Sequence, residues 1–206
     1  MDSAVNARAL FQGSRGERAV GAKHVSSIIA WEVRAPENIG AIVRLAANFA
    51  CQRVFFVEAA GTEHNHRRIR KTAVSAPSHL QWEFVTAAEF AATPIARQTI
   101  VGLETSHGSV DLREAQWPSE CALMVGSESY GLPDEALALC AFTIHIPIAG
   151  PLKSLNVSHA LAIALFDATY SSTREGTDQS AEDVNDAVSE TTVVDSLVPP
   201  NAKATT

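Results

Sequence analysis

Three short segments of this chain place polar side chains next to glycine or proline, a composition that suits loops which hold a ligand or a reacting group. The first, residues 36–44, reads PENIGAIVR, with Asn38 and Arg44 six residues apart and Gly40 between them. Gly40 lets the backbone pass close to a neighbour. Taken alone, Asn38 is explained as the N-cap of a helix and Arg44 as a surface arginine. The segment predicts a strand-to-helix turn and leaves its chemistry open.

The second segment, residues 123–133, reads LMVGSESYGLP. An apolar strand that ends at Gly126 and is followed by Glu128 predicts a ligand site, because crevices at the carboxyl ends of strands are the usual sites in open α/β sheets. The pattern is similar to a nucleophile elbow, but the required Gly-x-Ser-x-Gly is absent. A hydrolase is therefore disfavoured.

The third segment, residues 144–160, reads IHIPIAGPLKSLNVSHA and runs from a strand through a loop into a helix. Ser154 and Asn156 lie where this helix begins, and both are ordinary capping residues there. Ser158 and His159 do not form a Ser/His pair, since adjacent helix positions do not face each other. The segment predicts a polar loop at a strand end, with capping as its simplest explanation.

The elements that position these segments follow an α/β pattern. Short, continuously apolar runs alternate with helical patterns, which predicts a mostly parallel sheet flanked by helices. The expected strands are 25–33, 53–58, 82–85, 99–104, 122–126 and 142–146. The last expected helix, 156–170, is apolar nearly all round. It must be covered on two sides, either within its own domain or by a partner subunit.

Composition sets the domain organisation. The 206 residues are 46% hydrophobic, enough for one core, and we expect a flexible arm over 1–24, a domain over 25–171 and an acidic disordered tail over 172–206. The net charge of -7 is unlike that of a basic nucleic-acid binder, but seven acids and only two bases lie in residues 173–206. Attraction to phosphate must therefore come from local patches.

Three cysteines, Cys51, Cys121 and Cys140, have no close partner in the sequence. They predict a reduced, cytoplasmic protein without disulfides or a metal site. No apolar run approaches the roughly 18 residues of a membrane span, so no membrane association is expected.

One local basic patch is present. Four bases fall within five residues, namely Arg67, Arg68, Arg70 and Lys71. They could form a phosphate footprint for RNA or simply the solvated face of a helix, and the sequence favours neither.

Together and in this order, the three segments resemble the signature of the SpoU (TrmH) family of RNA 2′-O-ribose methyltransferases, in the SPOUT superfamily. Segment 36–44 resembles Asn-x-Gly-x-x-x-Arg, segment 123–133 resembles Val-Gly-x-Glu-x-x-Gly-Leu, and segment 144–160 resembles Ile-Pro-x-x-Gly-x-x-x-Ser-Leu-Asn-Val-Ser-x-Ala. The resemblance implies a C-terminal trefoil knot, a homodimer, and transfer of a methyl group from S-adenosylmethionine to a ribose 2′-hydroxyl of tRNA or rRNA.

The resemblance also implies residue roles. Arg44 would meet the phosphate and ribose hydroxyl of the target nucleotide; because guanidinium stays protonated, a positioning role is chemically safer than that of a base. The other implied catalytic residues are Asn38, Glu128, Ser154 and Asn156. The implied cofactor-binding residues are Leu103, Gly126, Ile146, Ser154 and Leu155, of which Leu103 matches the family only loosely.

Two alternatives stand beside this reading. One is a catalytically silent knotted protein that binds RNA or ribosomes, but all the motif residues that can be checked are present. The other is a base methyltransferase of the same superfamily. The Ser-Leu-Asn tripeptide at 154–156 favours ribose chemistry instead.

Overall fold

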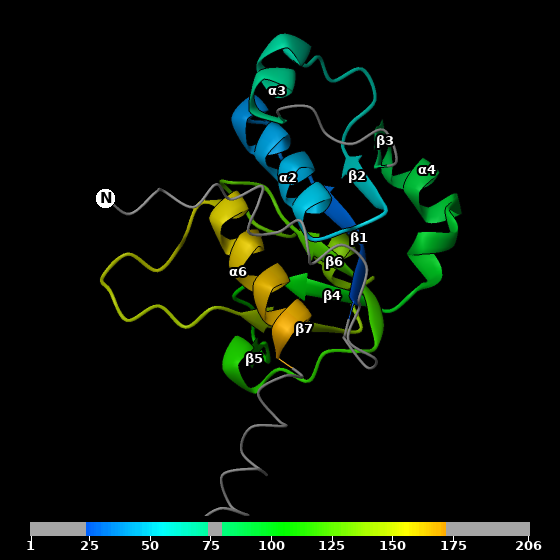
Figure 1. Cartoon of the computed structure of the whole chain (residues 1–206). Helices are drawn as coiled ribbons and strands as arrows, with labels where there is room; N and C mark the ends of the chain where they lie inside the picture. The colour runs from blue at the N-terminus through cyan, green and yellow to red at the C-terminus, as the bar shows by residue number, and fades with distance from the viewer. Residues whose placement is uncertain (1–23, 74–79, 172–206) are drawn as a thin grey trace, which may run out of the picture. The chain divides into compact units, whose positions relative to one another are not determined.

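A computed structural model describes residues 24–73 and 80–171 of the chain. Its strands form one sheet of seven in the order β3-β2-β1-β6-β4-β7-β5 (Figure 1), and every pairing is parallel. The strands are β1 (His24–Trp31), β2 (Arg53–Val57), β3 (Gln81–Val85), β4 (Ile100–Leu103), β5 (Val110–Asp111), β6 (Glu120–Val125) and β7 (Phe142–His145). The prediction of a mostly parallel sheet is confirmed.

Helices cover both faces of this sheet. They are α2 (Pro36–Asn48), α3 (His66–Ala73), α4 (Ala87–Ala92), α5 (Asp134–Leu137) and α6 (Val157–Tyr170), with short 3-10 turns η2 (Pro94–Arg97) and η3 (Leu112–Glu114). Ile28 of β1 belongs to a core cluster with Leu165 of α6, whereas the next residue, Ile29, belongs to a second cluster with Phe90 of α4. Burial on both faces explains why the strands are continuously apolar.

The strand order gathers the three polar segments at one edge of the sheet. In a parallel sheet all carboxyl ends lie at the same edge, and β1, β6, β4 and β7 are consecutive neighbours. The segment that begins at Pro36 follows β1, the loop after Gly126 follows β6, and the loop that leads to α6 follows β7. Figure 1 shows α2 and α6 side by side over the sheet.

Helix α2 corrects one prediction. Asn38 is not its N-cap: the helix begins at Pro36, Ala35 takes the cap position, and Asn38 lies within the first turn. Proline suits the first helical position because its fixed φ matches the helix and it lacks the N–H that would have no partner there. The Asn38 amide is therefore free to contact other loops.

Helix α6 begins where the sequence indicated. Asn156 is its N-cap, and the Asn156 side chain accepts a hydrogen bond from the Ser158 backbone N–H. Ile163, Phe166 and Tyr170 are exposed along it, so the alternative of a helix buried wholly within its own domain is wrong for the single chain.

Some expectations stay open. The predicted arm, up to residue 23, and the predicted acidic tail, 172–206, lie outside the described residues. The trefoil knot stays a prediction. Among the described helices, none combines the length and the apolarity that crossing a membrane requires.

Candidate active site

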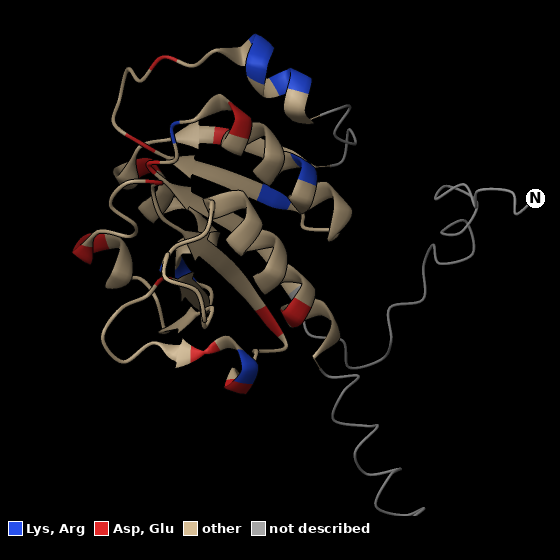
Figure 2. Cartoon of the chain, turned by 90° about the vertical axis from the view of Figure 1, so that its left-hand side faces the viewer, with Lys and Arg blue, Asp and Glu red and all other residues tan. Residues whose placement is uncertain are grey.

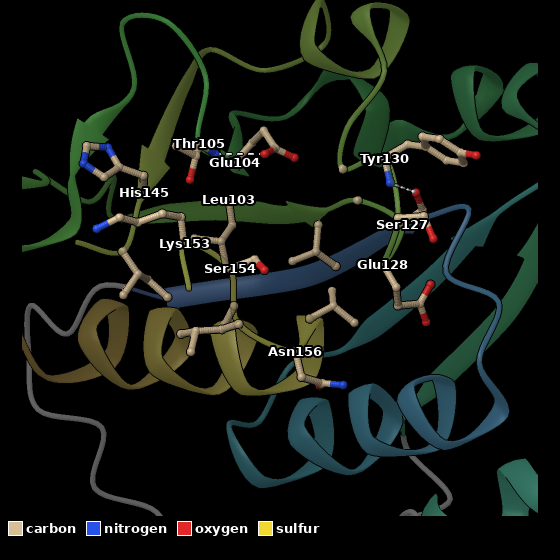
Figure 3. Close-up of a pocket in the computed structure, with 18 of the residues that line it drawn as sticks. Leu103, Glu104, Thr105, Ser127, Glu128, Tyr130, His145, Lys153, Ser154 and Asn156 are labelled. Atoms are coloured by element: carbon tan, nitrogen blue, oxygen red, sulfur yellow. Dashed lines mark hydrogen bonds between the residues drawn. The ribbon is translucent and has the colours of Figure 1, made fainter. Parts of the chain in front are cut away.

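A chain of side-chain hydrogen bonds joins the three polar segments. The Asn38 amide donates to the Glu128 carboxylate at 2.8 Å, and the Asn156 amide donates to Asn38 Oδ1 at 3.0 Å. Asn156 Oδ1 then accepts from the Ser158 hydroxyl at 2.7 Å. Figure 3 shows the Asn156 amide extending from the start of α6 toward the neighbouring helix. Residues 118 positions apart in the chain are thus in direct contact.

Glu128 also fixes the backbone that leads into α2. Its carboxylate oxygens accept from the N–H groups of Arg34 at 3.4 Å and Ala35 at 3.2 Å. Desolvation raises the pKa of Glu128, but the hydrogen bonds from Asn38 and from these backbone groups outweigh it, so the pKa lies below its ordinary value. Glu128 is therefore an ionised hydrogen-bond acceptor at neutral pH.

A cavity of about 450 Å³ lies beside this chain of hydrogen bonds, at the carboxyl ends of β4, β6 and β7 (Figure 3). Its volume falls in the range of small-molecule sites. Every residue for which the family resemblance implied cofactor binding lines it: Leu103, Gly126, Ile146, Ser154 and Leu155. Glu128 and Asn156 line the cavity as well. Asn38 is hydrogen-bonded to both of these residues and so lies next to the cavity wall.

A tight turn closes one side of the cavity. Ser127 and Gly131 exchange two backbone hydrogen bonds of 3.1 Å, and Gly131 has a φ of 66°, in the left-handed region that favours glycine. A Cβ on Gly126 would overlap the Gly131 backbone. The turn itself thus requires the glycine at 126, which the sequence attributed to the approach of a ligand.

Glu104 and His145 are among the titratable residues that line the cavity and that sequence reasoning missed. Glu104, just after β4, accepts from the Leu132 N–H at 2.8 Å and so joins the β4 loop to the turn after β6. His145, at the end of β7, contacts Ser109 Oγ through Nδ1 at 3.0 Å. The available signal was position, since each is a polar residue at a strand's carboxyl end.

Arg44 is placed differently from the other implied catalytic residues. It is exposed on α2 and is not among the described residues that line the cavity. Asn38 and Arg44 are six residues apart on one helix, which separates their directions by about 120°. The single chain therefore brings together Asn38, Glu128 and Asn156, with Ser154 in the cavity wall, but not Arg44.

The basic cluster lies on α3, apart from the cavity lining. Figure 2 shows Lys and Arg gathered on this short helix. All four basic side chains are exposed, and Arg68 forms an ion pair of 2.6 Å with Glu37 at the start of α2. Gly40 explains how α3 packs so closely, because a Cβ there would lie 2.6 Å from the Ile69 carbonyl oxygen.

Comparison with known proteins gives a consistent set of similarities. A model described as the SpoU rRNA Methylase family matches residues 26–166. A 23S rRNA (uridine(2479)-2'-O)-methyltransferase from Streptomyces viridochromogenes is 30% identical over 142 residues, which cover 65% of this chain and 48% of that protein. A tRNA (guanosine(18)-2'-O)-methyltransferase from Escherichia coli (strain K12) is also 30% identical over 142 residues, which cover 66% of this chain and 59% of that protein.

This chain thus spans only 48% to 59% of the length of these two relatives. A solved structure, described as giving insights into the 2-OH methylation of C/U34 on tRNA, superposes with a TM-score of 0.62 at 27% identity. The superposition covers 73% of this chain and 97% of that one.

Proposed function

The chain belongs to the SpoU rRNA Methylase family, and we propose on this premise that it transfers a methyl group from S-adenosylmethionine to the ribose 2′-hydroxyl of an RNA nucleotide. The observation that carries the proposal is the hydrogen-bonded chain from Glu128 through Asn38 to Asn156. It fixes polar groups of three separate loops beside one cavity of suitable volume.

The cavity fits S-adenosylmethionine in size and in chemistry. Leu103, Ile146 and Leu155 supply apolar cover for a flat base, and their main chain at the strand ends supplies hydrogen-bonding groups that can read the base edge. Glu104 and His145 supply polar groups for the ribose of the cofactor and for its charged methionine end. When bound, the cofactor supplies an electrophilic methyl group on a sulfonium.

The residues of this chain would orient the ribose and receive its proton. A neutral hydroxyl is a poor nucleophile until it is positioned, and the amides of Asn38 and Asn156 are held rigidly enough to do so. The hydroxyl becomes acidic only as the new bond forms, so a weak base suffices as proton acceptor. The ionised carboxylate of Glu128 is such a base.

Arg44 and the basic cluster would hold the RNA outside the cavity. Guanidinium remains protonated, so Arg44 acts as a fork of donors on a phosphate near the target nucleotide. The exposed basic residues Arg67, Arg70 and Lys71 add sequence-independent attraction to the phosphate backbone of tRNA or rRNA. Replacing all three with Glu should weaken RNA binding and leave the affinity for S-adenosylmethionine unchanged. Unchanged RNA affinity would reject this part of the proposal.

The exposed side of α6 suits a second copy of the chain. The rings of Phe166 and Tyr170 are in tilted contact with centroids 5.0 Å apart, and Ile163 is exposed on the same helix. Apolar groups that gather on one helix indicate an interface. We therefore propose a homodimer, for which light scattering should give twice the chain mass, and we keep the expectation of a cytoplasmic location. A monomer at micromolar concentration would contradict it.

One experiment tests the function directly. The purified protein is incubated with tritiated-methyl S-adenosylmethionine and separate tRNA and rRNA fractions, and the RNA is digested to nucleosides. The expected product is a 2′-O-methylnucleoside, and the Asn38→Ala variant should form far less of it. A base-methylated nucleoside would refute ribose chemistry. Absence of both transfer and calorimetric cofactor binding would favour the silent RNA-binding protein.

A further inference from the structure

Tyr130 stands out among the apolar side chains that face solvent. It is 91% exposed, a larger fraction than any other exposed large apolar residue of the described chain, and it lies at the rim of the cavity. A single exposed aromatic residue is common on protein surfaces, so exposure alone carries no conclusion. Its support and its neighbours are more informative.

The backbone beneath Tyr130 is held firmly. The Tyr130 N–H donates to Ser127 Oγ at 3.1 Å, within the turn that Ser127 and Gly131 close. The Glu104 carboxylate accepts from the Leu132 N–H and so ties this turn to the loop after β4. A tyrosine on a fixed backbone has only two side-chain torsions to order, so its ring can bind a flat partner at low entropic cost.

The ring projects to the side where the RNA would arrive. Figure 3 shows Tyr130 and Glu128 leaving the turn on the side away from Leu103. Leu103 lies in the part of the cavity assigned to the cofactor, whereas Glu128 belongs to the hydrogen-bonded chain assigned to the ribose. A nucleotide whose ribose meets Glu128 must place its base close by, because base and sugar are directly bonded.

We propose that the ring of Tyr130 is a stacking platform for the base of the nucleotide whose ribose is methylated. This inference rests on the proposed methyl transfer and adds a residue that positions the substrate. Stacking uses the flat face that all four bases share, so Tyr130 contributes affinity and orientation without selecting a base. Selection of the RNA then falls to contacts elsewhere.

The test compares Tyr130→Ala, Tyr130→Leu and Tyr130→Phe in steady-state methyl transfer to the RNA fraction that the wild type methylates. Loss of one stacked base corresponds to roughly a tenfold rise in KM for RNA, expected for both Ala and Leu. Phe keeps the flat ring and should stay within about twofold of the wild type. Cofactor affinity, measured by calorimetry, should not change. Leu139→Ala, a surface control outside the cavity lining, should match the wild type.

A second arm removes the base instead of the ring. RNA with an abasic nucleotide at the modified position should bind the wild type as weakly as it binds Tyr130→Ala, since either change deletes the same contact. If the abasic nucleotide weakened binding to Tyr130→Ala as much as it weakens binding to the wild type, the two losses would be independent and the proposal would be overturned. An unchanged KM in Tyr130→Ala would overturn it as well. If Tyr130→Ala lost cofactor affinity to the same extent, the proposal would be overturned and the ring would be assigned to the cofactor's adenine. If the molecular mass of Tyr130→Ala were half that of the wild type, the ring would instead be assigned to the contact with a second copy. A wild type that methylates no RNA would overturn both proposals.

Discussion

The substitution Asn38→Asp tests the site at the residue on which its three loops converge. Asn38 is 8% exposed, donates to Glu128 and accepts from Asn156. Aspartate has nearly the same shape and can still accept from Asn156. The change therefore converts a single contact, the bond to Glu128, from attraction into repulsion between two carboxylates.

The magnitude follows from the distance. Two unit charges about 4 Å apart repel by about 4 kcal/mol at an effective dielectric constant near 20, and exposure of Glu128 to water reduces this to roughly half. A lost hydrogen bond to a charged group adds about 1.5–3 kcal/mol. Some relaxation is expected, so the free energy of unfolding should fall by about 2–4 kcal/mol at pH 8.

The deficit should depend on pH with a definite sign. Repulsion raises the folded-state pKa of one of the two carboxyls above its unfolded value of about 4. Its destabilising effect is therefore absent below that value and grows as the pH rises through the raised folded-state pKa. Asn38→Ala introduces no charge, so most of its deficit should persist at acidic pH.

Urea unfolding of the wild type and both variants at pH 5 and pH 8 measures these terms, and methyl transfer at the same two pH values reports on the site. The Asp variant should recover part of its stability and activity at pH 5, while the Ala variant should recover neither. Equal deficits of the Asp variant at the two pH values would refute the reasoning, because the Asn38–Glu128 contact would then not be the one disturbed.

Three further measurements address other contacts. Hydrogen bonds hold the pKa of Glu128 below its ordinary 4.5. The stability of the wild type relative to Glu128→Gln should therefore increase as the pH rises toward 4.5 and stay constant above it. A stability difference that does not vary with pH would argue against an ionised Glu128. Burial raises the pKa of Cys51 and Cys121 to about 12, so iodoacetamide at pH 8 should modify neither before unfolding, as read by intact mass. Trp117→Phe removes an indole donor 2.9 Å from the Asp167 carboxylate and should lower the free energy of unfolding by about 1–3 kcal/mol, whereas an unchanged urea midpoint would count against that bond.

The sequence predicted most of the sheet because burial on both faces leaves a continuous apolar run. That signal located six strands, and each end of each strand was predicted to within two residues. It failed for β5, which has two residues, one of them the exposed Val110. The insertion of β6 between β1 and β4 has no local signal either, because strand order depends on contacts between distant residues.

The site was predicted where a motif marked it and missed where it depended on spatial neighbours. Asn38 was misread as a cap because the amide's true partners, Glu128 and Asn156, lie 90 and 118 residues away. Glu104 belongs to no motif, and only the parallel pairing of β4 with β6 brings it to Leu132. Residue type and spacing thus located the loops but not the hydrogen bonds between them.

Helix periodicity explains why one motif serves two surfaces. Gly40 faces α3, as the short distance from its position to the Ile69 carbonyl indicates. Arg44, four residues later, lies on nearly the same side of α2, whereas Asn38 points about 120° away from Arg44 into the hydrogen-bonded chain. The arginine of the motif therefore shares a side of α2 with the basic helix. An RNA strand whose target ribose lies against Asn38, beside the cavity, and which continues over α2 toward α3 would meet Asn38, Arg44 and the basic cluster in turn. This path requires no movement of Arg44 into the cavity.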